Sequence, residues 1–229
     1  MKEETKKKLG DWMQFKAFQE LDSVSQELGQ LYAVKKVYPE PRNIFRAFDY
    51  IKPENLKIVV VGQDPYNNTF ISRRDGVTRL PYATGIAFGN SPLAPVISPS
   101  LKLIKKSVVD CGYILLEDDL TGWAKQGVLM LNSALTVEDG QPNSHQKLWE
   151  PFTKSLLKEI SDRYTGMIYI LIGSRAASFQ SVLNPVSSNV LTCEHPARAI
   201  HEGREWNHGC IWKKANDLLF KIEKSWIRW

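Results

Sequence analysis

The chain has 229 residues, of which 43% are hydrophobic and 24% charged, a balance typical of a globular domain with a full core. Lysine and arginine outnumber aspartate and glutamate by 30 to 25, and the net charge of +5 favours a polyanionic partner without identifying one. The cysteines Cys111, Cys193 and Cys210 form no CxxC pair, and no apolar stretch approaches the ~18 residues of a membrane span. The composition therefore excludes membrane, collagen-like and disulfide-rich secreted proteins, and we expect an intracellular, cytoplasmic or nuclear, protein.

The amino-terminal part of the chain has a helical pattern. Residues 1–10 are rich in charge, and we expect a flexible start there, followed by one domain over residues 11–229. Large apolar residues recur every third position from Trp12 to Leu21, which predicts an amphipathic helix.

Further along the chain, four apolar runs predict strands that are buried on both faces. Each run stops at a polar or glycine residue, and the runs cover residues 57–61, 128–131, 167–172 and 189–193. Helical patterns lie between and after them, at residues 101–110 (opened by Ser98, Pro99 and Ser100), 144–164, 175–183 and 206–225. This alternation predicts an α/β fold, a single domain with a central, mainly parallel four-stranded sheet flanked by helices.

The residues that follow the four strands predict where a ligand binds. Parallel strands end at one edge of a sheet, and ligands bind beyond their carboxyl ends. The side chains expected to converge there are Gln63, Asp64, Tyr66, Asn132, Ser174 and His195.

These side chains suit a planar ring better than other ligands. Ser174 lies in GSR rather than in a GxSxG nucleophile elbow, and the chain has neither a GxxxxGK[ST] nor a GxGxxG phosphate motif. Asn132 offers a hydrogen-bond donor and an acceptor, Phe88 a stacking face, and His195 a donor for charge on a leaving ring. Asp64 can orient a water molecule or favour a cation. The set predicts a nucleobase pocket without a metal.

Several motifs carry a resemblance to a known family. They are GQDPY at 62–66, GIAFGN at 85–90, LMLNSALTVE at 129–138, NSH at 143–145 followed by Trp149, IGS at 172–174 and HPA at 195–197. In order and spacing they resemble the motifs of family 1 uracil-DNA glycosylases, and the resemblance covers nearly the whole chain.

The resemblance implies an enzyme of base excision repair. It implies cleavage of the N-glycosidic bond of a flipped-out uracil in DNA, which leaves an abasic site and needs no metal or cofactor. Asp64 and His195 take the catalytic positions. The uracil-binding positions fall on Gln63, through a backbone donor, and on Tyr66, Phe88 and Asn132.

The resemblance also implies contacts with DNA and protein partners. Gly173 and Ser174 match a phosphate-gripping turn, and Ser98 and Ser100 match a serine-proline loop. Uracil-containing DNA is the expected substrate of a monomer, and a protein inhibitor that mimics DNA is a conceivable partner.

The chain departs from the family pattern after His195. The family usually continues S-P-L-S, with a leucine wedge, whereas this chain has Ala197, Arg198, Ala199 and Ile200, with Ala199 at the aligned wedge position. Because alanine fills a vacated base step poorly, we predict weak base extrusion from duplex DNA and a preference for single strands, unless Ile200 or Arg198 takes over.

Two further departures lie next to GQDPY. Asn67 replaces the family's histidine, which puts any contact of that histidine in doubt. Residues 67–84 form a longer link than usual and carry Arg73, Arg74 and Arg79. These arginines either contact DNA phosphate or belong to a solvated surface loop, and the second interpretation is favoured.

Other functions remain open alongside the main hypothesis. A catalytically weak DNA-binding or processivity module on the same fold is one, and a glycosylase for another damaged base is a second. Cys193 and His195, with His208 and Cys210, also offer four zinc ligands, although their one-residue spacings make inert thiols the favoured interpretation.

Overall fold

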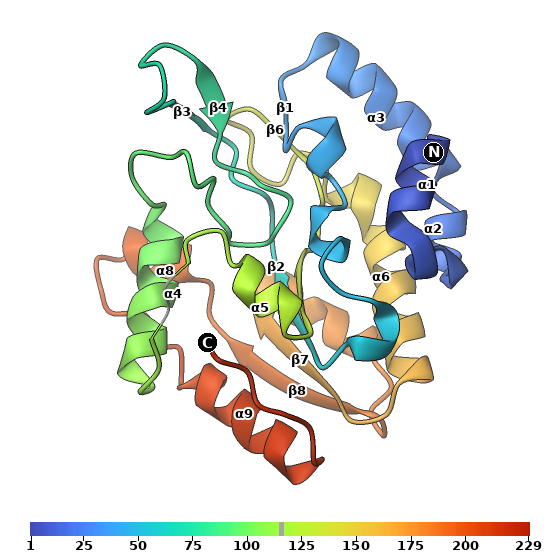
Figure 1. The fold of residues 1–229 in the computed structure, drawn as a ribbon, viewed down its shortest axis with the longest axis vertical. Helices are drawn as coiled ribbons and strands as arrows, with labels where there is room; N and C mark the ends of the chain where they lie inside the picture. The colour runs from blue at the N-terminus through green and yellow to red at the C-terminus, as the bar shows by residue number, and fades with distance from the viewer. Residues whose placement is uncertain (115–116) are drawn as a thin grey trace.

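The computed structural model describes residues 1–114 and 117–229 and is built around one parallel four-stranded sheet with helices on both faces (Figure 1). Its strands lie in the order β5-β2-β7-β8. They are β2 (Ile58–Gly62), β5 (Val128–Asn132), β7 (Met167–Ile172) and β8 (Ser188–Cys193). The predicted fold class is confirmed, and each strand begins and ends within one residue of its predicted bounds.

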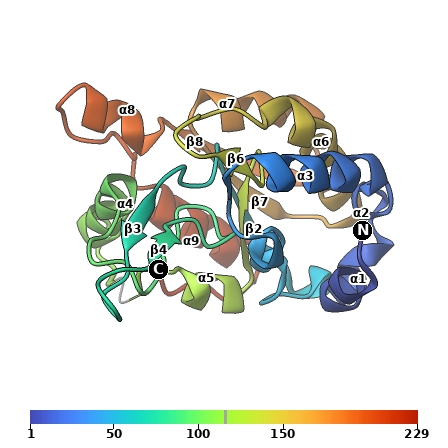
Figure 2. The ribbon, with the colours of Figure 1, turned by 90° about the horizontal axis from the view of Figure 1, so that it is seen from above.

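Alternate residues of the strands face two separate cores. Val59 and Val61 point toward an aromatic core, whereas Ile58 and Val60 point to the opposite face. The first core is covered by α1 (Glu3–Leu9), α2 (Lys16–Gln19), α3 (Asp22–Val34), α6 (Gln146–Arg163), α7 (Ser174–Ala177) and the 3-10 helix η5 (Ser178–Val182). The second is covered by α4 (Pro99–Asp110), α5 (Thr121–Lys125), α8 (Pro196–His201) and α9 (Ile211–Lys221) (Figure 2).

The amino-terminal segment differs from both expectations made for it. Residues 3–9 form α1, and Leu9 at its end is buried, where a flexible start was expected. The continuous helix expected from Trp12 to Leu21 is wrong: the chain forms the 3-10 helix η1 (Gly10–Gln14), becomes extended at Phe15 and resumes as α2. The break lets the Trp12 indole N–H donate to the Ile51 carbonyl at 2.8 Å while Phe15 is fully buried.

The other helices follow the prediction with changed bounds: α4 begins two residues earlier than predicted, whereas α6 and α9 are shorter. The Ser98 hydroxyl accepts a hydrogen bond from the Leu101 amide and caps α4, as the Ser-Pro-Ser pattern predicts. The helix expected at 175–183 is divided into α7 and η5. The helix expected from 206 begins only at Ile211, because Gly209 and Cys210 have φ of 55° and 49°, which a right-handed helix cannot include.

Short elements complete the chain. The 67–84 segment contains an antiparallel hairpin of β3 (Thr69–Ile71) and β4 (Arg79–Pro81), so it is more ordered than the expected surface loop. The rest are β1 (Val37–Tyr38), which pairs with β6 (Val137–Glu138), and the 3-10 helices η2 (Pro41–Asn43), η3 (Arg46–Phe48) and η4 (Pro53–Asn55). In the described part of the chain, no helix combines the length and apolarity that a bilayer span requires.

The connectivity of the sheet marks one place for a ligand. β5 pairs with one edge of β2, and β7, which comes next in the sheet, pairs with the other edge. The connections that leave β2 and β5 therefore run to opposite sides, and this leaves a crevice at the carboxyl end of β2.

Candidate active site

A cavity of about 230 Å³ lies at this crevice. A volume of this size suits one small ring rather than a drug-sized ligand. Its walls include six of the predicted site residues: Gln63, Asp64, Tyr66, Phe88, Asn132 and His195. Ser174, which was expected to converge with them, lies outside the lining.

Gly62 leaves room for two side chains of the cavity wall, those of Asn132 and Phe88. A Cβ atom at this position would lie 2.8 Å from the Asn132 Oδ1 and 3.0 Å from the Phe88 ring. Phe88 itself has a φ of 62°, an unusual conformation for a bulky residue, which aims its ring at the cavity mouth beside His195, with ring centroids 5.7 Å apart. The end of β2 therefore requires glycine for the carboxamide and the ring to approach each other.

Asp64 is held by hydrogen bonds from two directions. Its Oδ2 accepts the Asn143 backbone N–H at 2.7 Å, and its Oδ1 accepts from the Gln146 carboxamide. Burial raises the pKa of the Asp64 carboxyl above its usual value, while these hydrogen bonds act in the opposite direction. The carboxylate is thus fixed in place by neutral donors.

Gln146 and Arg175 are site residues that the sequence reasoning missed. The Arg175 Nε donates to the Gln146 Oε1 at 3.1 Å and so orients the carboxamide whose NH₂ faces Asp64. Arg175 also pairs with Glu150 at 3.1 Å. Both residues directly follow recognised motifs, NSH and IGS, and this adjacency was the available signal.

His195 is held as a neutral ring. Its Nδ1 accepts the Ala197 backbone N–H at 3.2 Å, which assigns the ring proton to Nε2. Burial lowers the pKa of His195 to about 4. A Cβ atom on Gly173 would lie 2.9 Å from the His195 Cβ, so the glycine, with its φ of 93°, allows the ring its position.

Asn132 and Tyr66 complete the cavity wall. Asn132 is 6% exposed, and its carboxamide forms no hydrogen bond with any other described residue, which leaves a donor and an acceptor for a ligand. The Tyr66 hydroxyl donates to the Phe88 carbonyl at 2.9 Å and accepts from the Ser98 hydroxyl at 2.6 Å. These two bonds fix the tyrosine ring, and burial raises its pKa.

The residues predicted to contact DNA divide into two groups. Ser100 and Ala197 line the cavity, and Ser174, Arg198 and Ile200 are at least partly exposed around it. Gly173, Ser98 and Ala199 are buried: Ser98 is 7% exposed with its hydroxyl engaged by Tyr66 and Leu101, and Ala199 is fully buried. The methyl group of Ala199, at the aligned wedge position, packs into the core beneath α8.

A hollow of about 520 Å³ adjoins the cavity and shares part of its wall. Ile200, which is 42% exposed, lines this hollow together with Ser100, Ala197 and Lys102. An apolar side chain and a lysine thus line a hollow that shares Tyr66, Ser100 and Ala197 with the cavity.

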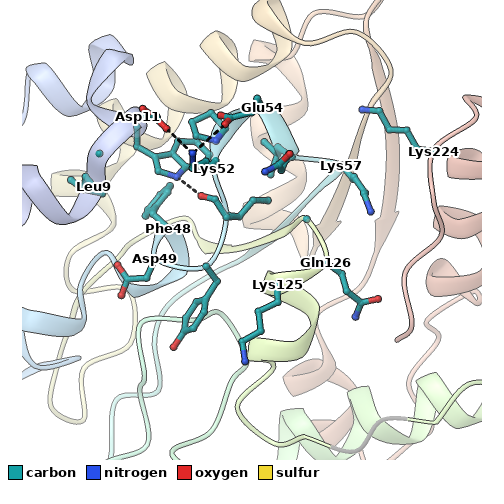
Figure 3. A pocket seen from close by; sticks show the side chains of 18 of the residues that line it. Leu9, Asp11, Phe48, Asp49, Lys52, Glu54, Lys57, Lys125, Gln126 and Lys224 are labelled. Atoms are coloured by element: carbon teal, nitrogen blue, oxygen red, sulfur yellow. Dashed lines mark hydrogen bonds and ion pairs between the residues drawn. The ribbon is translucent and has the colours of Figure 1, made fainter.

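A larger hollow, about 880 Å³, lies at the amino ends of the strands and is shown in Figure 3. Lys57 and Gln126, just before β2 and β5, line it. Lys52 lies 4.0 Å from Asp11 and 3.9 Å from Glu54, so these two carboxylates offset much of the positive charge of Lys52. Because ligands of parallel sheets bind at the carboxyl ends of the strands, we assign the smaller cavity as the functional site.

The zinc ligands considered from the sequence do not come together as a set of four. Among the described residues, the group with metal-ligand atoms within 4.8 Å of one another is Cys111, His208 and Cys210. Cys193 and His195 are not part of it, because His195 turns into the cavity.

Comparisons with known proteins agree with the motif resemblance. The family model described as "Uracil DNA glycosylase superfamily" matches residues 48–218. A uracil-DNA glycosylase from Aliarcobacter butzleri is 37% identical over 90% of this chain and 92% of its own length, and one from Campylobacter lari is 35% identical over 85% and 80%.

Solved structures share the fold. The crystal structure of mimivirus uracil-DNA glycosylase superposes with a TM-score of 0.83 at 24% identity and covers 96% of this chain and 86% of that one. A variant of the mimivirus protein in complex with UGI gives a TM-score of 0.84 at 24% identity, with 96% and 88% covered.

Proposed function

The chain belongs to the uracil-DNA glycosylase superfamily, and we propose that its cavity binds a uracil turned out of DNA for hydrolysis by Asp64 and His195. Relatives 35% and 37% identical over most of the chain give it uracil-DNA glycosylase activity, the hydrolysis that begins base excision repair. The observation that carries the residue assignment is the meeting of an unengaged Asn132 carboxamide, the Asp64 carboxylate and the neutral His195 ring in one small cavity.

Base recognition follows from hydrogen-bond matching and shape. The Asn132 carboxamide accepts from N3–H and donates to O4 of uracil, whereas cytosine presents the opposite pattern and would leave buried groups unpaired. Phe88 stacks on the ring. Tyr66, fixed by its bonds to Phe88 and Ser98, occupies the space that the methyl group of thymine needs.

The chemistry is the separation of charge between sugar and base. The bond between C1′ of deoxyribose and N1 of uracil breaks with its electron pair on the base, so the sugar gains oxocarbenium character. Asp64 stabilises that positive charge and orients the water that adds to C1′. The hydrogen bonds from Asn143 and Gln146 keep the carboxylate in position before substrate arrives.

His195 stabilises the departing base. Its Nε2–H donates to O2 of uracil, where negative charge develops as the bond breaks. The ring acts as a neutral donor, because burial holds its pKa at about 4. Uracil therefore leaves as an anion held by hydrogen bonds, without prior protonation of the base.

We further propose that the DNA surface around the cavity favours single strands. Extrusion of a base from a stable duplex costs a few kcal/mol, and a large apolar wedge offsets part of that cost. With Ala199 buried, Ile200 is the apolar side chain left beside the cavity mouth. The chain acts as a monomer, and the same surface is where a protein that mimics DNA would bind; a variant of the mimivirus protein is known in complex with UGI.

The test of the base assignment uses end-labelled single-stranded oligonucleotides that differ in one base. Strands with uracil, thymine or hypoxanthine are incubated with the protein, treated with alkali and separated by size. We expect strand breaks at uracil alone. DNA retention in a gel shift with no break at uracil would instead identify a binding module, and breaks at hypoxanthine would identify a glycosylase for another base.

A further inference from the structure

Three side chains with metal-binding atoms meet between α4 and α9, in a part of the fold that the proposed reaction does not use. Cys111 directly follows α4, and His208 and Cys210 directly precede α9. The two Sγ atoms lie 2.6 Å apart, and the Cys111 Sγ lies 3.8 Å from the His208 Nδ1. The segments that carry them are far apart in sequence, so the fold itself assembles the group.

The His208 ring is held beside the thiols. Its Nδ1 accepts the Cys210 backbone N–H at 3.2 Å, and a bound ion would take the lone pair from this hydrogen bond. Its Nε2 lies 3.7 Å from the Asp110 Oδ2. Metal-bound histidines commonly donate their second ring N–H to a carboxylate, which fixes the tautomer and raises the basicity of the ligating nitrogen.

The backbone of this segment is held in an unusual conformation. Cys210 has φ 49° and ψ 44°, in the left-handed region that a residue with a Cβ rarely adopts, and Gly209 before it has φ 55°. Such positions persist where the surrounding structure fixes them, and they cluster at functional sites. Here the turn brings His208 and Cys210 to one point opposite Cys111.

The Sγ atoms of Cys111 and Cys210 lie too close together for two neutral thiols. Two lysines, Lys213 and Lys214, lie close to the cysteines. Lys213 pairs with Asp217 at 2.9 Å, and the Lys214 Nζ would lie 3.6 Å from a Cβ atom on Gly209. A bound cation would displace the thiol protons, neutralise two thiolates and separate the sulfur atoms.

We propose that Cys111, His208 and Cys210 bind a divalent transition-metal ion, with zinc the best match to two sulfur ligands and one imidazole nitrogen. A hollow of about 230 Å³ that is lined by His208 and Gly209 lies beside this group. A disulfide between Cys111 and Cys210 would not involve His208, so it would not account for the orientation of that ring toward Asp110. The ion would join the end of α4 to the start of α9, so its role is structural.

The test uses the full chain, reduced with a phosphine that binds no metal, and Co²⁺ as an optical substitute for Zn²⁺. We expect thiolate-to-cobalt charge-transfer absorption and tetrahedral visible bands that saturate at one ion per chain and vanish when Zn²⁺ is added. Zn²⁺ is also expected to raise the melting temperature, since an ion that binds only the folded chain stabilises it.

Variants separate this cluster from other thiols. Cys111→Ser is expected to remove most of the charge-transfer absorption and His208→Gln to weaken Co²⁺ binding at least tenfold, whereas the matched control Cys193→Ser keeps the wild-type titration. Circular dichroism verifies the fold of each variant. The titration of the wild-type protein tests the proposal even where a variant fails to fold. Absence of a thiolate–cobalt band in the reduced wild type would overturn the proposal, as would an unchanged band in folded Cys111→Ser.

Discussion

His195 shows how one residue's surroundings set its chemistry. A free histidine with a pKa of 6.5 would be partly protonated near neutral pH, whereas burial lowers the pKa of this ring to about 4. The depressed pKa means that the folded protein favours the neutral ring. The His195 contribution to stability is therefore present above pH 6.5 and is lost as the pH falls from 6.5 toward 4.

The charge state of His195 can be measured directly. In an NMR titration of the imidazole C–H signals, assigned with a His195→Gln variant, we expect His195 to keep its neutral shift from pH 8 down to about pH 5, because its pKa is about 4. Activity should correspondingly show no step from this ring near its ordinary pKa, and the acid limb should begin where Asp64, whose pKa is raised by burial, gains a proton. A His195 midpoint near 6.5 would contradict the neutral-donor role.

We expect Tyr66 to determine which pyrimidine enters the cavity. Tyr66→Ala should open space for the methyl group of thymine and so permit slow thymine excision, while uracil excision falls because Phe88 and Ser98 lose their bonds to the hydroxyl. A single methyl group in a pocket is worth roughly 10–200-fold in rate, and the lost discrimination should lie in that range. The matched control is Tyr66→Phe, which keeps the ring and should still exclude thymine. If both variants exclude thymine equally, the methyl-blocking role is wrong.

At the scale of elements, we expect α8 to decide how the DNA strand is engaged. Its Ala199 faces the core and its Ile200 is 42% exposed beside the cavity mouth. We expect the wild type to excise uracil faster from single strands than from duplex, and Ile200→Ala to lower the duplex rate several-fold further with little effect on single strands. Val186→Ala serves as the control, since Val186 is an exposed apolar side chain just before β8, at the opposite end of this strand from His195. An equal or greater duplex rate in the wild type would refute the weak-wedge hypothesis.

The elements also explain what the sequence could and could not predict. β2, β5 and β7 were predictable because they are buried on both faces, as in the five buried residues of β2, whereas the edge strand β8 is only partly buried, which differs from the expectation. The helical spacing from Trp12 onward led to the wrong prediction of one continuous helix. The aromatic rings there pack with one another and with Phe48, and this tertiary packing interrupts the helix at Phe15. The short β3–β4 hairpin gave only a weak pattern, although buried Phe70 packs against Tyr82 within it.

The candidate site was predictable for a different reason. Gln63, Asn132 and His195 lie at strand ends, and the rule for parallel sheets predicts from chain order alone that such residues meet. Gln146 and Arg175 act on Asp64 only through contacts between segments far apart in the chain. No local pattern marks such contacts, and the same holds for the meeting of Cys111 with Cys210.

At the scale of the whole molecule, the modest charge limits DNA affinity. The net charge is only +5, and many lysines and arginines are already paired with carboxylates, as Arg204 is with Glu194 at 2.6 Å. Each phosphate contact adds about −0.9 to the slope of log K against log salt for duplex DNA, so two to four contacts predict a shallow slope of about −2 to −4. Fluorescence anisotropy with a labelled duplex over a salt series measures it. A slope steeper than about −6 would show a more concentrated basic surface than we infer.

The central claim, that Asp64 and His195 act on a uracil held in the 230 Å³ cavity, is tested most directly by single-turnover release of uracil from a single-stranded oligonucleotide. Asp64→Asn and His195→Gln should each lower the rate by about 10²–10³-fold, because each removes stabilisation that is made only as charge develops. DNA binding in a gel shift should change little for either variant. Asp162→Asn, which removes an exposed carboxylate on α6, should keep the wild-type rate. Wild-type rates in both active-site variants, or a loss of rate matched by an equal loss of DNA binding, would contradict the account.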